Sequence, residues 1–130
     1  MQKIDLKGKT VLVTGAAGFI GSNLVIELFK TIEDIRIVGI DNLNSYYDVS
    51  IKEWRLKEIA KLNGQWNFIK GDISDKATVD EIFEKFHPLV VVNLAAQAGV
   101  RYSITNPDAY IQSNLIGFYN ILEACRHSYD

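Results

Sequence analysis

Hydrophobic and polar positions along the chain fall into blocks that predict strands and helices in strict alternation. Short apolar runs predict four strands, of which the first and the last have the composition of strands buried on both faces. Apolar residues that recur every three or four positions predict an amphipathic helix after each strand. The predicted strands span residues 10–14, 35–40, 66–70 and 89–94, and the predicted helices span residues 19–29, 49–62, 76–86 and 107–126.

This alternation predicts the fold class. Strands that are separated by helices pair in parallel through right-handed crossovers, which leaves helices on both faces of the sheet. No linker, internal repeat or low-complexity tract indicates a boundary inside the chain. We therefore expect one α/β domain over residues 1–130, the N-terminal part of a doubly wound parallel sheet of the Rossmann type.

Composition and charge narrow the possible partners. The net charge of −2 argues against nucleic acid, because that ligand is bound by clustered Lys and Arg. No run approaches the roughly 20 apolar residues of a membrane span, and the first nine residues lack the apolar stretch of a signal peptide. The single cysteine, Cys125, can form no internal disulfide, so we expect an idle thiol. We expect a cytoplasmic protein with no nucleic-acid, membrane or metal partner.

A glycine-rich loop follows the first predicted strand. Gly15, Gly18 and Gly21 form a G-x-x-G-x-x-G run that opens the first helix. Glycine permits a tight turn with positive φ and lets the backbone approach a pyrophosphate, to which the helix N-terminus offers amide donors. A P-loop is excluded because no Gly-Lys-Ser or Gly-Lys-Thr follows. This context predicts dinucleotide binding.

An acidic residue stands where such a site needs one. Asp41 lies twenty positions after Gly21, at the end of the second predicted strand, where a carboxylate accepts hydrogen bonds from the adenosine ribose. The same charge would repel a 2′-phosphate, which favours NAD over NADP. Asp72 follows the third strand and could either cap the next helix or belong to the site.

Longer strings in the sequence carry a family resemblance. The segments TGAAGFIGS, DNLNSYYD, GDI, NLAAQAGVRYS and NPDAYIQSNLIGFYNILEACR resemble the extended short-chain dehydrogenase/reductase family of NAD-dependent sugar-nucleotide epimerases and dehydratases. Within that family they look most like UDP-glucuronate 4-epimerases. The resemblance covers nearly the whole chain, and it implies that the C-terminal strands and the substrate domain of the family lie outside residues 1–130.

The resemblance also implies a set of site residues. The glycine loop would hold the NAD pyrophosphate, and Asp41 would hold the ribose. Asp72 and Ile73 would contact the adenine, and the end of the fourth strand would lie beneath the nicotinamide side. A substrate diphosphate or sugar carboxylate could meet Arg101 and Ser103, although a solvated loop is an equal alternative for the arginine. The expected cofactor-binding residues are Gly15, Gly18, Phe19, Ile20, Gly21, Asp41, Asn42, Asn44, Ser45, Asp72, Ile73, Leu94, Ala95, Ala96, Gln97 and Asn114.

The catalytic pair of this family is absent from the sequence. The resemblance to UDP-glucuronate 4-epimerases implies conversion of UDP-glucuronate to UDP-galacturonate by transient oxidation at C4, with a Tyr-x-x-x-Lys pair that supplies the base. None of the six tyrosines is followed four positions later by lysine, and Tyr46, Tyr47 and Tyr102 are more typical of loop residues that cover apolar surface. We therefore expect a fragment without catalytic residues that is inactive alone and exposes a sheet edge prone to self-association, and a homodimer for the full-length enzyme.

Three other interpretations remain open. A sugar-nucleotide 4,6-dehydratase or a related reductase shares the same N-terminal half. A binding-only protein that senses NAD needs the cofactor pocket but no catalytic tyrosine. A doubly wound domain without any ligand predicts no stabilisation by NAD.

Overall fold

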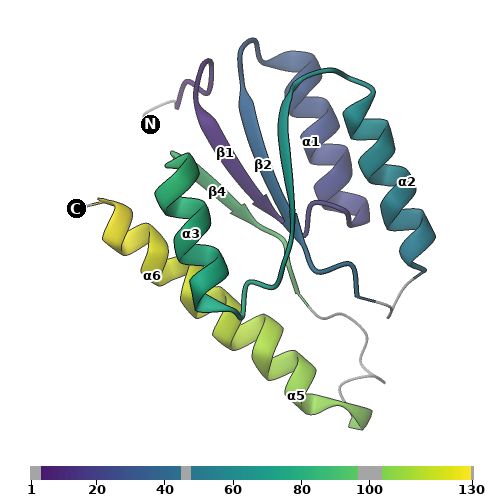
Figure 1. The fold of residues 1–130 in the computed structure, drawn as a ribbon, viewed down its shortest axis with the longest axis vertical. Helices are drawn as coiled ribbons and strands as arrows, with labels where there is room; N and C mark the ends of the chain where they lie inside the picture. The colour runs from purple at the N-terminus through teal and green to yellow at the C-terminus, as the bar shows by residue number, and fades with distance from the viewer. Residues whose placement is uncertain (1–3, 45–47, 97–103, 130) are drawn as a thin grey trace.

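The computed structural model describes residues 4–44, 48–96 and 104–129, which form a parallel sheet flanked by helices (Figure 1). All of the predicted strands and helices are present. Their bounds are β1 Thr10–Thr14, α1 Phe19–Thr31, β2 Arg36–Asp41, α2 Val49–Ala60, β3 Gln65–Lys70, α3 Lys76–Phe86, β4 Val90–Asn93, α5 Pro107–Tyr110, the π-helix η1 Ile111–Gly117, and α6 Phe118–Tyr129.

The strand order is β3-β2-β1-β4, and every pair is parallel. The chain starts in the middle of the sheet, moves outward to β3 and then crosses back to place β4 on the other side of β1. The connections that follow β1 and β4 therefore diverge to opposite faces, and a crevice opens between the carboxyl ends of these strands. The predicted doubly wound fold is confirmed.

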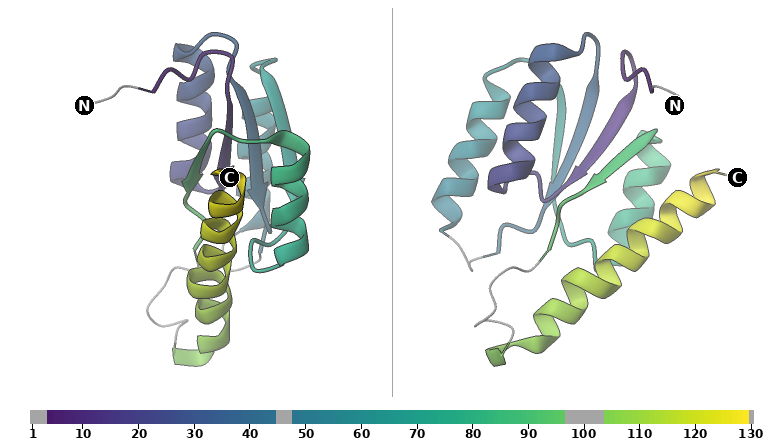
Figure 2. Two further views of the ribbon diagram at one scale, coloured as in Figure 1. Left: turned by 90° about the vertical axis from the view of Figure 1, so that its left-hand side faces the viewer. Right: turned by 180° about the vertical axis from the view of Figure 1, so that it is seen from behind.

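Helices cover both faces of the sheet (Figure 2), and a hydrophobic core lies on each face. On one face Val11 and Val13 of β1 pack with α1 and α2, where Val25 and Ile59 are fully buried. On the other face Leu12 packs with residues of α3 and α6. Successive residues of β1 therefore serve opposite cores, as the two-residue period of a strand requires.

The burial predicted for the fourth strand is wrong. Every residue of Val90–Asn93 is half-buried rather than buried. The reason is that β4 pairs only with β1 and forms an edge of the described sheet, so one side of the strand lacks a neighbour. Apolar composition alone does not distinguish an edge strand from a central one.

The last predicted helix is interrupted by a π-helix. Pro107 lies in the first turn as predicted, and the Asn106 side chain caps it by accepting a hydrogen bond from the Ala109 N–H at 3.3 Å. The turns then widen into η1 before α6 resumes, a change that no hydrophobic period announces. Figure 1 shows α5 and the adjoining turns projecting past the carboxyl ends of the strands.

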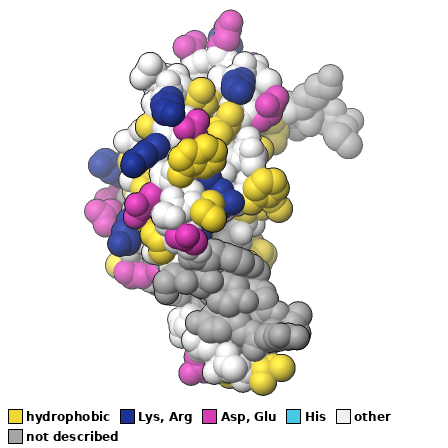
Figure 3. Space-filling view, turned by 90° about the vertical axis from the view of Figure 1, so that its right-hand side faces the viewer, with side chains coloured by type: hydrophobic (Ala, Val, Ile, Leu, Met, Phe, Trp, Pro, Cys, Tyr) yellow, Lys and Arg dark blue, Asp and Glu magenta, His cyan; other side chains and the backbone are white. Residues whose placement is uncertain are grey.

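Several apolar residues of the predicted helices do not pack on the sheet. Ile20, Ile51 and Trp54 are 67%, 47% and 60% exposed, and Ile59 is the only buried residue of α2. On the side where α2 lies, hydrophobic side chains are exposed among charged ones (Figure 3). None of the helices formed by the described residues combines the length and hydropathy that crossing a membrane requires.

Candidate functional site

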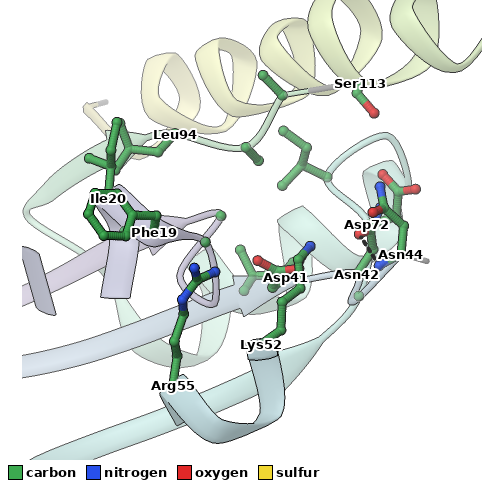
Figure 4. Close-up of a pocket in the computed structure, with 18 of the residues that line it drawn as sticks. Phe19, Ile20, Asp41, Asn42, Asn44, Lys52, Arg55, Asp72, Leu94 and Ser113 are labelled. Atoms are coloured by element: carbon green, nitrogen blue, oxygen red, sulfur yellow. Dashed lines mark hydrogen bonds and ion pairs between the residues drawn. The ribbon is translucent and has the colours of Figure 1, made fainter. Parts of the chain in front are cut away.

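A cavity of about 560 Å³ lies at the carboxyl ends of the strands (Figure 4). Its walls come from the glycine loop, the ends of β2, β3 and β4, α2 and η1. Its size is typical of small-molecule sites. Of the residues expected to bind a cofactor, those that line it are Gly15, Gly18, Phe19, Ile20, Gly21, Asp41, Asn42, Asn44, Asp72, Ile73, Leu94, Ala95 and Ala96.

The remaining expected residues are not part of this lining. Asn114 is exposed on η1, and its neighbour Ser113 lines the cavity instead. Outside the described residues lie Ser45, Gln97, Arg101 and Ser103, together with Tyr46, Tyr47 and Tyr102.

The glycine loop is packed too closely for larger residues at two positions. Gly15 has φ +69°, and a Cβ there would come within 2.9 Å of the Ala95 backbone nitrogen. A Cβ at Gly21 would overlap the Gly15 carbonyl oxygen. Glycine at these positions therefore brings the loop against the end of β4 and against the first turn of α1.

The N-terminus of α1 opens into the cavity without a capping side chain. The N-cap residue is Gly18, which makes no side-chain hydrogen bond, and the first turn contains no acidic residue. The N–H groups of Phe19, Ile20 and Gly21 have no acceptor within the helix. Together with the helix dipole they form a site that suits an anion.

Asp41 closes the cavity on the β2 side and is held in a fixed position. Its Oδ2 accepts a hydrogen bond from the Ala17 N–H at 3.1 Å, and its Oδ1 accepts one from the Leu43 N–H at 2.8 Å. The ammonium of Lys52 lies 3.3 Å from Oδ1, and the side chains of Lys52 and Asp41 are only 11% and 5% exposed. The carboxylate is therefore a preorganised acceptor whose charge is largely balanced.

Thr14 attaches the β4 wall of the cavity to β1. Its buried hydroxyl accepts hydrogen bonds from the backbone N–H groups of Leu94 at 2.9 Å and Ala95 at 3.0 Å, and it donates to the side chain of Asn93. All three hydrogen-bonding positions of the hydroxyl are used. These bonds hold the backbone after β4 beside the glycine loop.

The wall after β3 is fixed in a similar way. The Asp72 side chain accepts from the N–H and hydroxyl of Ser74, and the N-cap of α3 is Asp75. The capping alternative for Asp72 is thus wrong, and Asp72 lines the cavity. The buried Asn120 of α6 donates from Nδ2 to the Ile73 carbonyl at 2.9 Å, which joins the helix to this wall.

Helix α2 contributes a face to the cavity that the sequence analysis missed. Asp48, Ile51, Lys52 and Arg55 all line it. These residues are spaced by three and four positions, which places them on one face of a helix. The sequence contains this spacing, but the apolar pattern predicted only the face of the helix that packs on the sheet. Hydrogen bonds from Ser50 hold the pKa of Asp48 below its usual value, so this exposed carboxylate is charged at neutral pH.

The arrangement is suited to binding a small molecule. Its described part combines an uncapped helix N-terminus, a fixed carboxylate and exposed apolar side chains, with no group of residues that could hold a metal ion. The glycines remove the side chains that would block a backbone from approaching a phosphate. These features fit a dinucleotide.

Comparison with known proteins agrees with this geometry. A family model described as GDP-mannose 4,6 dehydratase matches residues 12–130. Protein CapI of Staphylococcus aureus is 52% identical over 117 residues, which are 90% of this chain and 34% of CapI. UDP-glucuronate 4-epimerase 3 of Arabidopsis thaliana is 42% identical over 120 residues, which are 92% of this chain and 27% of that enzyme.

A solved structure is similar as well. A variant of UDP-glucuronic acid 4-epimerase from Bacillus cereus, in complex with UDP-4-deoxy-4-fluoro-glucuronic acid and NAD, superposes with a TM-score of 0.80 at 34% identity. The match covers 91% of this chain and 36% of that chain. The chain thus spans between about a quarter and about a third of the length of these three proteins.

Proposed function

Because the chain belongs to the GDP-mannose 4,6-dehydratase family of NAD-dependent epimerases and dehydratases, we propose that it forms the NAD-binding part of a UDP-glucuronate 4-epimerase. The observation that carries this proposal is the cavity in which the uncapped N-terminus of α1 and the fixed carboxylate of Asp41 face one space. A dinucleotide needs both groups, one for its diphosphate and one for its ribose.

Each wall of the cavity has a role in this proposal. The N–H groups at the start of α1 bind the diphosphate, and Asp41 accepts from the adenosine ribose. The segment Asp72–Ile73 contacts the adenine, and the exposed apolar surface of Phe19, Ile20 and Leu94 borders the nicotinamide side. The chemistry supplied by bound NAD is removal of hydride from the sugar C4 and its return to the opposite face.

We propose further that these 130 residues bind cofactor but do not catalyse epimerisation alone. No tyrosine among them has a lysine four positions later. The greater length of the relatives supports a catalytic pair and a sugar-binding part outside this chain. A 4,6-dehydratase is the second candidate, favoured by the description of the family model, whereas the relatives named above favour the epimerase.

A thermal-shift series tests cofactor binding. The protein as naturally expressed is melted with NAD, with NADP and without ligand, and NAD should raise the midpoint because it binds only the native state. The Asp41→Asn variant should lose most of this shift, while Glu53→Gln, which changes an exposed acid on α2, should keep it. Absence of a shift with NAD in the unsubstituted protein would contradict the proposal.

An activity assay distinguishes the two enzyme classes. We expect the full-length enzyme of which this chain would form the NAD-binding part to interconvert UDP-glucuronate and UDP-galacturonate, as followed by chromatography of the nucleotide sugars, and the 130 residues alone to leave both sugars unchanged. Formation of a 4-keto-6-deoxy product from a nucleotide sugar, without epimerisation, would replace the epimerase with the dehydratase.

A further inference from the structure

Two cations of α2 face the cavity, and they have different surroundings (Figure 4). Lys52 points toward Asp41 and forms an ion pair with it, so the pair brings little net charge to a ligand. Arg55 lies one helical turn further along α2, where its guanidinium reaches the glycine loop.

Arg55 forms no ion pair among the described residues. Its Nη1 donates to the Ala17 carbonyl oxygen at 3.2 Å, and its Cζ lies 5.9 Å from the centre of the Phe19 ring. A guanidinium carries five N–H donors, so most of them remain available to a ligand. The side chain is half-buried and lines the cavity, which reduces the screening of its charge by water.

The two contacts of Arg55 locate it relative to the rest of the site. Phe19 is the first residue of α1, and Ala17 donates the hydrogen bond that holds Asp41. The guanidinium therefore lies between the helix N-terminus that suits an anion and the carboxylate that suits a ribose. A diphosphate seated on α1 would be neutralised on the glycine-loop side only by backbone N–H groups, and Arg55 offers the full positive charge that they lack.

We propose that Arg55 binds the diphosphate of the cofactor, opposite the N–H groups at the start of α1, and that this arginine supplies much of the electrostatic attraction for the dinucleotide. The inference rests on the proposed function, since it assigns a further ligand in the same NAD site. A planar guanidinium can hold two phosphate oxygens at once, which a lysine at this position could not do.

The test compares three variants of the naturally expressed protein, Arg55→Gln, Arg55→Lys and Lys57→Gln. Lys57 is an exposed cation on the same helix that does not line the cavity, so its variant is the matched control for loss of charge. The NAD dissociation constant is measured by isothermal titration calorimetry at several salt concentrations. The same titrations are repeated with NADP.

R55Q should weaken NAD binding about tenfold at low salt, the usual effect of losing one charged hydrogen bond. It should also make the NAD dissociation constant less dependent on salt concentration, because the positive charge that salt screens has been removed. The NAD dissociation constant of R55K should lie between those of R55Q and the unsubstituted protein. K57Q should bind NAD with the affinity and salt dependence of the unsubstituted protein. The R55Q substitution should reduce the affinity for NADP by no more than it reduces the affinity for NAD.

Three results would overturn the inference. Unchanged NAD affinity in R55Q would mean that Arg55 does not contact the ligand. Weaker binding with unaltered salt dependence would mean that Arg55 only positions the glycine loop through Ala17. A larger loss for NADP than for NAD would mean that Arg55 binds a 2′-phosphate. In each case the unsubstituted protein still binds NAD, whereas failure of that binding would contradict the proposed function itself.

Discussion

Replacing Thr14 with valine should release the β4 wall of the cavity from β1. Valine has nearly the shape of threonine but no hydroxyl, so Thr14→Val removes three hydrogen bonds without creating a cavity. The bonds lost are those to the N–H groups of Leu94 and Ala95 and to the side chain of Asn93. The packing of the fully buried residue 14 changes little.

The cost can be worked out from the partners left behind. The Leu94 N–H keeps an acceptor in the Thr14 carbonyl oxygen at 3.3 Å. Among the described residues no second acceptor of this kind serves the Ala95 N–H, and an unsatisfied donor costs about 1–3 kcal/mol. We therefore expect the unfolding free energy to fall by about 2 kcal/mol. At roughly 4 °C per kcal/mol for a domain of this size, the melting midpoint should drop by about 8 °C.

Thermal unfolding followed by circular dichroism, together with NAD titration, measures both consequences. Thr14→Ser is the matched control, since it keeps the hydroxyl and removes one buried methyl at about 1 kcal/mol. T14V should weaken NAD binding because the segment after β4 is released, and T14S should not. A T14V protein that melts within about 1 °C of the unsubstituted protein and binds NAD equally well would refute the reasoning.

Three further predictions concern other positions. Gly21→Ala should lower the unfolding free energy by about 1–3 kcal/mol in urea titration and abolish the NAD shift, because its Cβ would overlap the loop backbone; unchanged values would contradict this packing. Lys52→Met should cost about 3 kcal/mol, since Asp41 would keep a charge with its side chain only 5% exposed, whereas the exposed Lys57→Met should be nearly neutral in the same titration. Burial raises the pKa of the Cys125 thiol, so iodoacetamide should alkylate the native chain at pH 8 more slowly than the urea-unfolded chain, and equal rates would count against burial.

The parts of the site that the sequence predicted are those set by local backbone rules. Gly15 and Gly21 are required by the close approach of one loop to its own helix and to β4, and such spacing can be read along the chain. Asp41 follows from its place at the end of a strand. Neither prediction needed knowledge of how distant segments pack, and both residues line the cavity.

The parts that escaped prediction depend on contacts between distant segments. Thr14 meets its partners about 80 positions away, and Asn120 reaches Ile73 across 47 positions, so no local pattern announces either bond. Ser113 rather than Asn114 lines the cavity from the π-helix, and the widened turns of a π-helix have no hydrophobic signature. Arg55 was overlooked because the charged face of a helix is ordinarily solvated, and only its packing against the glycine loop distinguishes it.

These distant contacts also connect ligand binding to the stability of the whole sheet. The cavity takes its walls from the ends of all four strands; Thr14 ties the wall after β4 to β1, and Asn120 ties the wall after β3 to α6. A ligand that touches every wall binds only when all four strand ends are assembled, so its binding free energy adds to the unfolding free energy of the domain, by about 2.7 kcal/mol at a hundredfold excess over the dissociation constant. That gain is comparable to the cost expected for T14V, and saturating NAD should therefore restore most of the melting midpoint that this variant loses.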